Sequence, residues 1–390
     1  MDIAIIANFC RDFSETDNGR FMYLAKKLSE NNEVEIITSD FYHEKKTHRE
    51  KVTVKWPFKI TYIHEPGYKK NVSIKRFLSH KTLAKNLTKH LKTRKKPDVI
   101  YCAVPSLDFT QAASIYAKQY NIKFIVDIQD LWPEAFKMVF NIPVVSNLIF
   151  APMNWQANRI YKSADHIVAV SKTYLQRARQ VNKSTDITVV FLGTEMSTFD
   201  SYATQNSTND DKTKIAYIGT LGNSYDIENV IRAIDKLTNK KNLKFVIMGD
   251  GPSRGRFEKF AKQFDFEIEF TGRLDYPEMV SRLTDCDIAI NPIVKGSAGS
   301  VINKVGDYAM AGLPVINTQE CQEYRDLIDI YHAGINCECE NVDEIANAIS
   351  ILCENEEIRI KMGKGNRKMA AEKFDREQTY QQIKKVILEN

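Results

Sequence analysis

A loop of small residues that leads into a lysine is the strongest chemical signal in the sequence. Residues 295–304 read Lys-Gly-Ser-Ala-Gly-Ser-Val-Ile-Asn-Lys and follow an apolar run that ends at Ile290. Small residues let backbone N–H groups approach a diphosphate, and a helix beginning near Ser300 would add the favourable field of its N-terminus. Lys304 and Asp307 are three positions apart and would share one helix face. The lysine could neutralise a departing diphosphate and the carboxylate could bind ribose hydroxyls, although an ordinary surface ion pair would give the same pattern.

A second short motif, Gly249-Asp250-Gly251-Pro252, follows another apolar run and precedes a helical pattern. Its glycines would let the backbone come close to a ligand, and Pro252 suits the first turn of a helix. A dinucleotide-binding fingerprint would need a third glycine where Arg254 stands, so support for a dinucleotide site is weak. A tight strand-to-helix turn explains the motif equally well.

Acidic residues end an apolar run in the first half of the chain, where the sequence reads Asp127-Ile-Gln-Asp130-Leu-Trp132-Pro133-Glu134. Asp127 would lie at the carboxyl end of a strand, which is where parallel sheets bind ligands. Asp130 could equally cap a helix, with Pro133 and Glu134 in its first turn. We therefore expect Asp127 to be the better candidate for contact with a substrate.

Metal-binding patterns are weak. Asp285-Cys286-Asp287 has the D-x-D spacing of some metal sites, but it directly precedes an apolar run and lacks acidic neighbours, so we expect a structural role. No pair of histidines has metal-ligand spacing. The seven cysteines are scattered without a C-x-x-C motif, which is typical of reduced thiols rather than of disulfides or a zinc site. The sequence therefore predicts no metal centre.

The candidate site residues described above lie in or next to short apolar runs that alternate with helical patterns. Such runs are typical of parallel strands buried on both faces and joined by helices. The expected strands are residues 2–7, 33–38, 98–103, 122–127, 166–170 and 187–191, then 214–218, 243–248, 267–271, 287–290 and 314–317. A polar linker, Thr194–Thr213, separates the two series. We predict two α/β domains, 1–200 and 201–373, facing each other across a ligand-binding cleft, with a final helix at 374–390 packing back on the first domain.

Basic residues are concentrated in one segment. The chain has a formal charge of +5, but Lys45–Lys96 alone holds 17 Lys and Arg against two acids. Its helical pattern predicts a basic amphipathic helix. The expected apolar face holds Ile74, Phe77, Leu78, Ala84, Leu87 and Leu91, and the expected basic face holds Lys75, Arg76, Lys81, Lys85, Lys89 and Lys92. An anionic membrane surface and a simple solvated helix explain the charge equally well, and nucleic acid explains it less well.

The order of motifs along nearly the whole chain resembles glycosyltransferase family 4, which has the GT-B fold. The motifs are Asn18-Gly19-Arg20, Ala164–Ser171, Gly249–Pro252, Gly272-Arg273 followed by Pro277-Glu278 and Asp287, and Asn303–Val315. Gln129–Glu134 is similar to the branch found in capsule, O-antigen and colanic-acid clusters. The chain departs from the family at four positions. Gly299 and Asp307 stand where the family has two glutamates, and Thr220 and Tyr225 stand where it has Arg and Lys.

The resemblance implies a retaining, hexosyltransferase-type enzyme that needs no metal or other cofactor. It would move a sugar from a nucleotide diphosphate sugar, with UDP favoured, to a hydroxyl of a lipid-linked glycan in cell-surface polysaccharide biosynthesis. Lys304 would supply the missing positive charge and, with Arg273 and the backbone of Gly299–Val301, stabilise the leaving diphosphate. Asp307 would hold the ribose, and Asp127 or Asp130 would orient the acceptor hydroxyl. The other expected donor-site residues are Gly219, Thr220, Gly222, Gly249, Ser300 and Val301, and the expected acceptor-side residues are Gly19, Arg20, Trp132 and Glu134.

Two alternatives remain. A nucleotide-sugar 2-epimerase shares the GT-B fold and would need ionisable groups flanking C2 of the sugar. A non-catalytic nucleic-acid binder would use Lys45–Lys96, but that segment lacks aromatics interleaved at base-reading spacing, so no nucleic acid is expected. With the transferase hypothesis, the same segment docks on an anionic membrane and the acceptor is polyprenyl-linked. The absence of a signal-like start and of a spanning apolar run predicts a cytoplasmic, peripheral protein.

Overall fold

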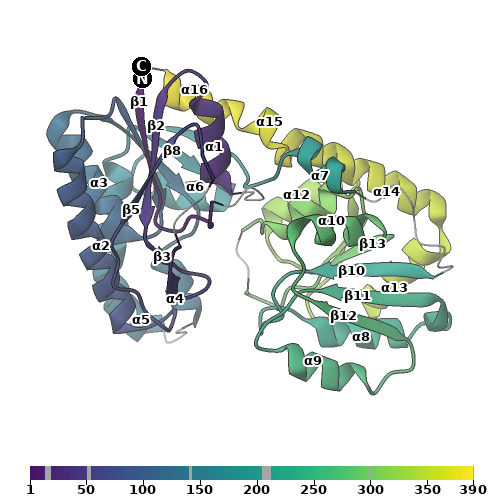
Figure 1. Ribbon diagram of the computed structural model, residues 1–390. Coiled ribbons are helices and arrows are strands. Elements are labelled where there is room, and N and C mark those ends of the chain that lie inside the picture. Colours follow the sequence, from purple (N-terminus) through teal and green to yellow (C-terminus); the bar gives the residue numbers. More distant parts are fainter. Residues whose placement is uncertain (14–18, 51–53, 140–142, 204–211, 298–299, 390) are drawn as a thin grey trace. The chain divides into compact units, whose positions relative to one another are not determined.

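The chain forms two compact α/β units, which are described separately. The computed structural model describes residues 1–13, 19–50, 54–139, 143–203, 212–297 and 300–389 (Figure 1). Unit 1 contains Met1–Val190 and Tyr380–Asn390, and unit 2 contains Phe191–Thr379. The expected α/β class with two parallel sheets is confirmed. The boundaries expected at residues 200 and 373 both fall inside unit 2.

Unit 1 is built on a parallel sheet of seven strands in the order β5-β2-β1-β6-β7-β8-β9. The strands are β1 (Asp2–Ile6), β2 (Glu33–Ser39), β5 (Lys59–Ile63), β6 (Val99–Val104), β7 (Lys123–Ile128), β8 (His166–Ala169) and β9 (Asp186–Val189). Continuous apolar runs form the central strands because both faces of the sheet are covered. In β1, Ile3 and Ile5 enter one core, whereas Ala4 and Ile6 enter the other.

Helices cover both faces of this sheet (Figure 1). One core is completed by α2 (Ile74–Thr93), α3 (Leu107–Tyr120) and α5 (Pro143–Lys162), and the other by α1 (Arg20–Leu28) and α16 (Gln381–Leu388). The shorter elements are α4 (Glu134–Val139), α6 (Lys172–Arg179) and an antiparallel pair, β3 (Phe41–Tyr42) and β4 (Thr47–His48). The last helix of the chain thus contributes Ile383 and Ile387 to the core beside α1.

Unit 2 has a six-stranded parallel sheet in the order β12-β11-β10-β13-β14-β15. The strands are β10 (Thr213–Ile218), β11 (Leu243–Met248), β12 (Glu267–Gly272), β13 (Ile288–Asn291), β14 (Val315–Asn317) and β15 (Gly334–Asn336). The helices are α7 (Met196–Tyr202), α8 (Ile227–Asp235), η1 (Lys240–Asn242), α9 (Arg254–Ala261), α10 (Tyr276–Thr284), α11 (Lys304–Met310), α12 (Gln322–Tyr331), α13 (Val342–Glu354), α14 (Glu356–Met369), η2 (Ala370–Phe374) and α15 (Arg376–Thr379). Asp226 and Asp275 cap α8 and α10, because their carboxylates accept the backbone N–H three residues on.

Each sheet contains one point where the strand order reverses. In unit 1 this point lies between β1 and β6, and in unit 2 it lies between β10 and β13. Connections leave such a point toward opposite sides, which opens a crevice at the carboxyl ends of the two strands. In unit 2, Gly219 follows β10 at this position. The topology therefore directs attention to the loops that follow β10 and β13.

The structure departs from the expected elements at the edges of the sheets. Every expected strand is present, but β5 and β15 of the two parallel sheets were not predicted, and neither was the antiparallel pair β3 and β4. β5 and β15 are edge strands: β5 lies in the cation-rich segment, and β15 has only three residues. The helix expected to begin near Ser300 begins at Lys304 instead. The Ser300 carbonyl, which would accept the Lys304 N–H in a longer helix, accepts the Gln319 side-chain amide at 2.6 Å.

Candidate active site

Glycines bring the loops after β10, β11 and β12 of unit 2 into close contact. Gly219 donates its N–H to the Met248 carbonyl at 2.9 Å and has φ 129°. A Cβ atom at Gly249 would lie 1.8 Å from the Gly219 oxygen, and one at Gly251 would lie 2.4 Å from the Leu221 oxygen. Only glycine fits at these positions, so the motif that follows β11 serves the packing of neighbouring backbone turns.

Lys304 places an uncompensated cation beside this glycine turn. A Cβ atom at Gly219 would lie 3.1 Å from Lys304 Nζ. The ammonium nitrogen is 4.1 Å from the ring centroid of Tyr217 and 3.9 Å from that of Tyr225. It is buried and has no hydrogen-bond partner among the described residues. Burial lowers the pKa of Lys304 well below its usual value, so an anion that enters here would stabilise the charged form.

Two tyrosines hold this part of unit 2 in place. The Tyr308 hydroxyl accepts the N–H of Ile218 at 3.0 Å and donates to the Ile290 carbonyl at 3.1 Å, which ties β10 to β13 at the point of reversal. The Tyr217 hydroxyl donates to the Thr220 carbonyl at 2.7 Å. Gly219, Thr220 and Lys304, three of the expected donor-site residues, therefore belong to one contact network.

Buried amides anchor the loop that precedes Lys304. Asn291, Asn317 and Asn336 occupy paired positions in β13, β14 and β15, and their side chains are hydrogen-bonded in a row at 2.9 Å. Gln319 accepts from Asn291 Nδ2 at 3.3 Å and holds the Ser300 carbonyl. Sequence reasoning missed these residues. The amides of Asn291 and Asn317, at the ends of two expected strands, were the available signal, although each amide taken alone is unremarkable.

The other expected donor-site residues have different surroundings. Asp307 lies one turn after Lys304 on α11 and accepts from the Tyr276 hydroxyl at 3.1 Å. Ser300 and Val301 are buried, whereas Arg273 is exposed after β12. Gly222 is open on its Cβ side apart from ordinary contact with Thr220. Gly299 lies outside the described residues.

Asp127, expected to contact substrate, is instead part of a buried ion pair in unit 1. The Arg20 guanidinium, at the start of α1, donates from Nε to Asp127 Oδ2 at 2.9 Å and from Nη2 to Oδ1 at 3.2 Å. Arg20 also donates to the Val190 carbonyl at 3.0 Å and the Tyr380 hydroxyl at 3.3 Å. Because Asp127 is 0% exposed, we correct its expected role from substrate contact to positioning of α1 and of the C-terminal segment.

The remaining expected acceptor-side residues surround the end of β7. Asp130 Oδ1 accepts the N–H of Leu131 at 2.8 Å and the Tyr174 hydroxyl at 3.3 Å, and burial raises the pKa of Asp130. Trp132 is buried, and Glu134 forms an ion pair with Arg177. Gly19 precedes α1 as its N-terminal cap residue. Of the two carboxylates expected to orient the acceptor, Asp127 and Asp130, Asp130 is therefore the one that is partly accessible.

The side chains of both candidate metal clusters make hydrogen bonds within the protein. Lys214 donates from Nζ to Asp285 and from its backbone N–H to Asp287, both at 2.8 Å, so the D-x-D carboxylates are engaged within unit 2. Among the described residues, Asp40, His48 and His64 could also bring ligand atoms within 4.8 Å of one another. In this structure His48 Nε2 lies 2.9 Å from the Glu65 carbonyl and donates a proton to it, and His64 Nδ1 lies 2.8 Å from Asp40 Oδ2.

Helix α2 carries the expected basic surface, but its apolar face differs from the expectation. Lys75, Lys81, Lys85, Lys89 and Lys92 are exposed, as expected. Ile74 and Leu78 are 79% and 57% exposed, whereas Arg76 is buried. Ser73 caps the helix by accepting the Arg76 N–H. The buried face of α2 carries Arg76, Ser79, His80, Leu83, Leu87 and Leu91. In the part of the chain that the structure describes, no helix has both the length and the apolar character to cross a bilayer.

Known proteins resemble the chain over most of its length. The family model described as Glycosyltransferase Family 4 matches residues 20–197, and the model described as Glycosyl transferases group 1 matches residues 199–369. The colanic acid biosynthesis glycosyl transferase WcaI of Escherichia coli (strain K12) is 24% identical over 275 residues. This alignment spans 66% of the chain and 66% of WcaI, which is just under two thirds of that relative's length.

Solved structures match at the level of the fold. Sucrose-phosphate synthase from Thermosynechococcus elongatus has a TM-score of 0.77 and 14% identity, with 99% of this chain and 98% of that chain covered. HepE of Anabaena, determined in complex with UDP, has a TM-score of 0.70 and 14% identity, with 99% of each chain covered. At these identities the likeness shows the GT-B fold.

Proposed function

We propose a specific reaction for this chain, which belongs to glycosyltransferase family 4, a family of glycosyltransferase enzymes with the GT-B fold. In the proposed reaction it moves a sugar from a nucleotide diphosphate sugar to a glycan hydroxyl in cell-surface polysaccharide biosynthesis. The observation that carries this proposal is the buried, unpaired ammonium of Lys304 beside Gly219 at the strand-order reversal of unit 2. The UDP complex of HepE favours UDP as the nucleotide. The similarity to WcaI favours a polysaccharide pathway.

The proposed chemistry replaces one bond at C1 of the sugar with another on the same face. The bond from C1 to the β-phosphate oxygen breaks, C1 bonds to the acceptor oxygen, and the acceptor proton passes to the leaving diphosphate or to water. Lys304 offsets the charge that develops on the diphosphate, and it does so from a desolvated position where such stabilisation is strong. Asp307 binds the ribose hydroxyls, and Asp130 accepts a hydrogen bond from the acceptor hydroxyl.

A ligand screen followed by a turnover assay tests this function. Thermal shifts are measured with UDP, GDP, ADP and dTDP sugars, because a ligand at 100 times its Kd stabilises the folded state by about 2.7 kcal/mol. The stabilising donor is then incubated alone and with glycan acceptors, and NMR reports the anomeric configuration of the product. Transfer with retention supports the proposal. Conversion of the sugar nucleotide without any acceptor would favour the 2-epimerase alternative instead.

Chelation is expected to leave turnover unchanged. The D-x-D carboxylates are already engaged by Lys214, and Lys304 can supply the positive charge that a divalent cation supplies in metal-dependent transferases. The measurement compares initial rates in EDTA with rates in added Mg²⁺ or Mn²⁺. Complete loss of turnover in EDTA, restored by either ion, would contradict the metal-free mechanism.

We further propose that the acceptor is lipid-linked and that unit 1 docks on the cytoplasmic face of an anionic membrane. Exposed lysines on α2 lie beside the exposed side chains of Ile74 and Leu78. Apolar side chains that enter the interface and cations that meet anionic headgroups act together in peripheral membrane binding. The departure of α2 from the expected register strengthens this proposal, because it exposes the two apolar residues at the end of the helix that also bears Lys75.

Vesicle binding is expected to depend on these lysines and on salt. The triple variant Lys81→Glu, Lys85→Glu and Lys89→Glu should no longer sediment with phosphatidylglycerol vesicles, while turnover on a short water-soluble acceptor survives. Wild-type binding should fall from 0.1 M to 1 M salt, as the Debye length shrinks from about 10 Å to about 3 Å. The matched control replaces three exposed lysines of α14 in unit 2, Lys361, Lys364 and Lys368, with Glu. Equal sedimentation with neutral and anionic vesicles would contradict the docking model.

A further inference from the structure

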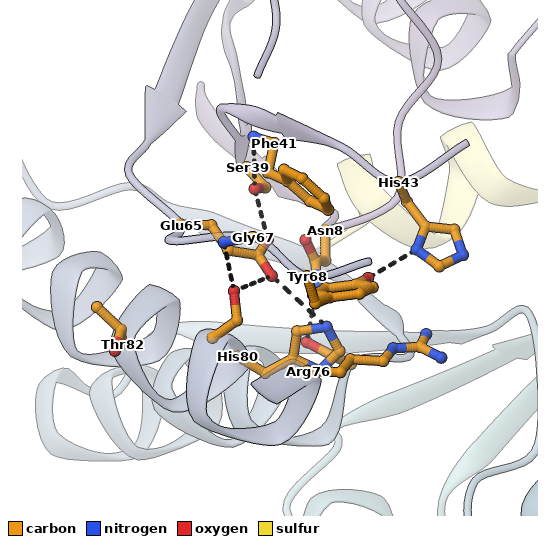
Figure 2. Close-up of polar contacts among 12 residues, drawn as sticks. Asn8, Ser39, Phe41, His43, Glu65, Gly67, Tyr68, Arg76, His80 and Thr82 are labelled. Atoms are coloured by element: carbon orange, nitrogen blue, oxygen red, sulfur yellow. Dashed lines mark hydrogen bonds and ion pairs between the residues drawn. The ribbon is translucent and has the colours of Figure 1, made fainter. Parts of the chain in front are cut away.

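A second group of basic side chains lies in unit 1, at the carboxyl end of its sheet. We call it the Arg76 pocket and define it by Phe9, His43, Lys46, Tyr68, Arg76 and Trp132. Phe9 follows β1 and Trp132 follows β7. Tyr68 lies between β5 and α2, and Arg76 lies in the first turn of α2. Figure 2 shows the Arg76 guanidinium and the His43 imidazole extending past the same end of the Tyr68 ring. The chemistry proposed for Lys304 uses none of these residues.

Arg76 is held by aromatic rings rather than by a carboxylate. Its guanidinium carbon is 4.6 Å from the ring centroid of Trp132, 5.4 Å from that of Tyr68 and 5.6 Å from that of Phe9. Nη1 donates to the Asn71 carbonyl at 2.7 Å. Arg76 is only 6% exposed, and its Nε has no hydrogen-bond partner in the described chain. A buried guanidinium in this condition favours the entry of an anion.

Two further basic groups stand at the more exposed side of the pocket. His43 Nδ1 lies 2.6 Å from the Tyr68 hydroxyl and 3.1 Å from Lys46 Nζ. Burial, together with the charges of Lys46 and Arg76, lowers the pKa of His43 to about 4. Lys46 Nζ is 5.2 Å from the Tyr68 ring centroid. Basic and hydrogen-bonding groups from three different segments of the chain thus surround the Tyr68 side chain.

Among the described residues, neither of the two carboxyl groups whose charges act on Arg76, those of Glu65 and Asp130, forms an ion pair with it, and both accept hydrogen bonds from other donors. Glu65 accepts from Ser39 at 2.6 Å and from Ser79 at 2.9 Å, while Asp130 accepts from the backbone of Leu131. Burial raises the pKa of both Glu65 and Asp130. Both carboxyl groups are thus hydrogen-bonded to other donors, and no carboxylate of the described chain forms an ion pair with the Arg76 guanidinium.

An apolar cavity adjoins the pocket across the Trp132 and His80 side chains. The two rings stack with centroids 5.8 Å apart, and both line the cavity, which has a volume of about 310 Å³. The rest of its wall is largely apolar and includes Phe77, Ile149 and Phe150. Ile149 is 63% exposed, so the cavity is bordered by an apolar surface of α5. A cationic site next to an apolar cavity matches a ligand that joins an anionic group to a hydrocarbon chain.

We propose that the Arg76 pocket binds the phosphate of a lipid phosphate to which the acceptor glycan is attached, with the first part of the lipid chain in the adjoining cavity. This assignment rests on the proposed transferase function and names the acceptor class for it. Phosphate fits better than carboxylate, because its tetrahedral oxygens can meet a guanidinium fork, an ammonium and a hydroxyl or imidazole from different directions. The aromatic rings keep Arg76 charged and oriented while the site is empty.

Calorimetric titration of the full chain tests the assignment, with saturating UDP present to occupy the donor site. The probes are farnesyl phosphate, its neutral match farnesol, and inorganic phosphate. We expect wild-type protein to bind farnesyl phosphate at least about tenfold more tightly than either other probe, and Arg76→Met to remove that preference while farnesol binding persists. Equal affinities for farnesyl phosphate and farnesol would overturn the proposal. Inorganic phosphate binding as tightly as farnesyl phosphate would overturn the lipid part.

Two further variants separate this proposal from folding defects and from the donor site. Lys46→Met, at the half-buried side of the pocket, should weaken farnesyl phosphate binding without changing the melting temperature, and it decides the matter if Arg76→Met does not fold. Lys304→Met should weaken UDP binding and leave farnesyl phosphate binding intact. Loss of farnesyl phosphate binding in Lys304→Met but not in Arg76→Met or Lys46→Met would place the phosphate at the donor site and overturn the proposal. If Lys304→Met binds UDP as tightly as the wild type does, this result would contradict the proposed function alone.

Discussion

Replacing Lys304 with methionine is expected to lower kcat by about 10²–10³-fold, the typical loss when one group that stabilises transition-state charge is removed. Methionine keeps most of the volume between the Tyr217 and Tyr225 rings and removes only the ammonium, so folding should be preserved. Steady-state kinetics on the purified variant give the measurement. A variant that keeps more than about a third of wild-type kcat would contradict the assigned role. Lys259→Met, which changes an exposed lysine on α9, is the matched control and should behave like wild type.

The same residue gives nucleotide binding a defined pH dependence. In the free protein burial lowers the pKa of Lys304, and the negative charge of a bound diphosphate raises it again. Between those two pKa values binding must take up protons, so nucleotide affinity should fall as pH rises. Calorimetry of UDP binding in buffers of different ionisation enthalpy measures the uptake. Lys304→Met should abolish the part of the uptake that depends on this ammonium, whereas Lys259→Met should retain it.

The sequence predicted the strands of both sheets well because buried parallel strands carry continuous apolar runs. It did not predict β5 and β15, which are edge strands where polar residues and short length weaken that signal. The start of α11 was also misplaced. The small residues at 296–300 are typical of a helix N-terminus, but the side-chain amide of Gln319 donates a hydrogen bond to the Ser300 carbonyl. Local propensity cannot report a competing partner nineteen residues away.

The sequence could indicate candidate site residues by their type and spacing, but it could not show which distant side chains surround them. Lys304 was singled out because a cation follows a small-residue loop, and the structure adds that its ammonium lies against two tyrosine rings and has no counter-ion in the described chain. Arg76 was assigned to the exposed basic face of its helix, because helical periodicity alone cannot reveal the aromatic rings of Phe9 and Trp132, which follow β1 and β7. Asp127 shows the opposite error. Its place at the end of a strand suggested substrate contact, but Arg20 from a different element neutralises it.

Breaking the Arg20–Asp127 pair from one side is expected to destabilise unit 1 by about 3–5 kcal/mol, because removal of one partner leaves the other charge buried and uncompensated. Asp127→Asn would leave the guanidinium of Arg20 against a neutral amide, and Arg20→Met would leave the carboxylate unpaired. All three tryptophans, Trp56, Trp132 and Trp155, lie in unit 1. Tryptophan fluorescence during urea unfolding therefore reports on this unit selectively.

The double variant Arg20→Met with Asp127→Leu distinguishes a structural pair from a catalytic carboxylate. If the pair is structural, removing both charges should recover much of the stability that either single variant loses, since no unpaired charge stays buried. The recovery is expected to be incomplete, because Arg20 also donates to the Val190 carbonyl and the Tyr380 hydroxyl. Asp127→Glu, which keeps the charge but adds a methylene, serves as the control for shape. If Asp127→Asn unfolds at the wild-type urea concentration yet loses turnover, the carboxylate acts in the chemistry and its assignment as a positioning residue is wrong.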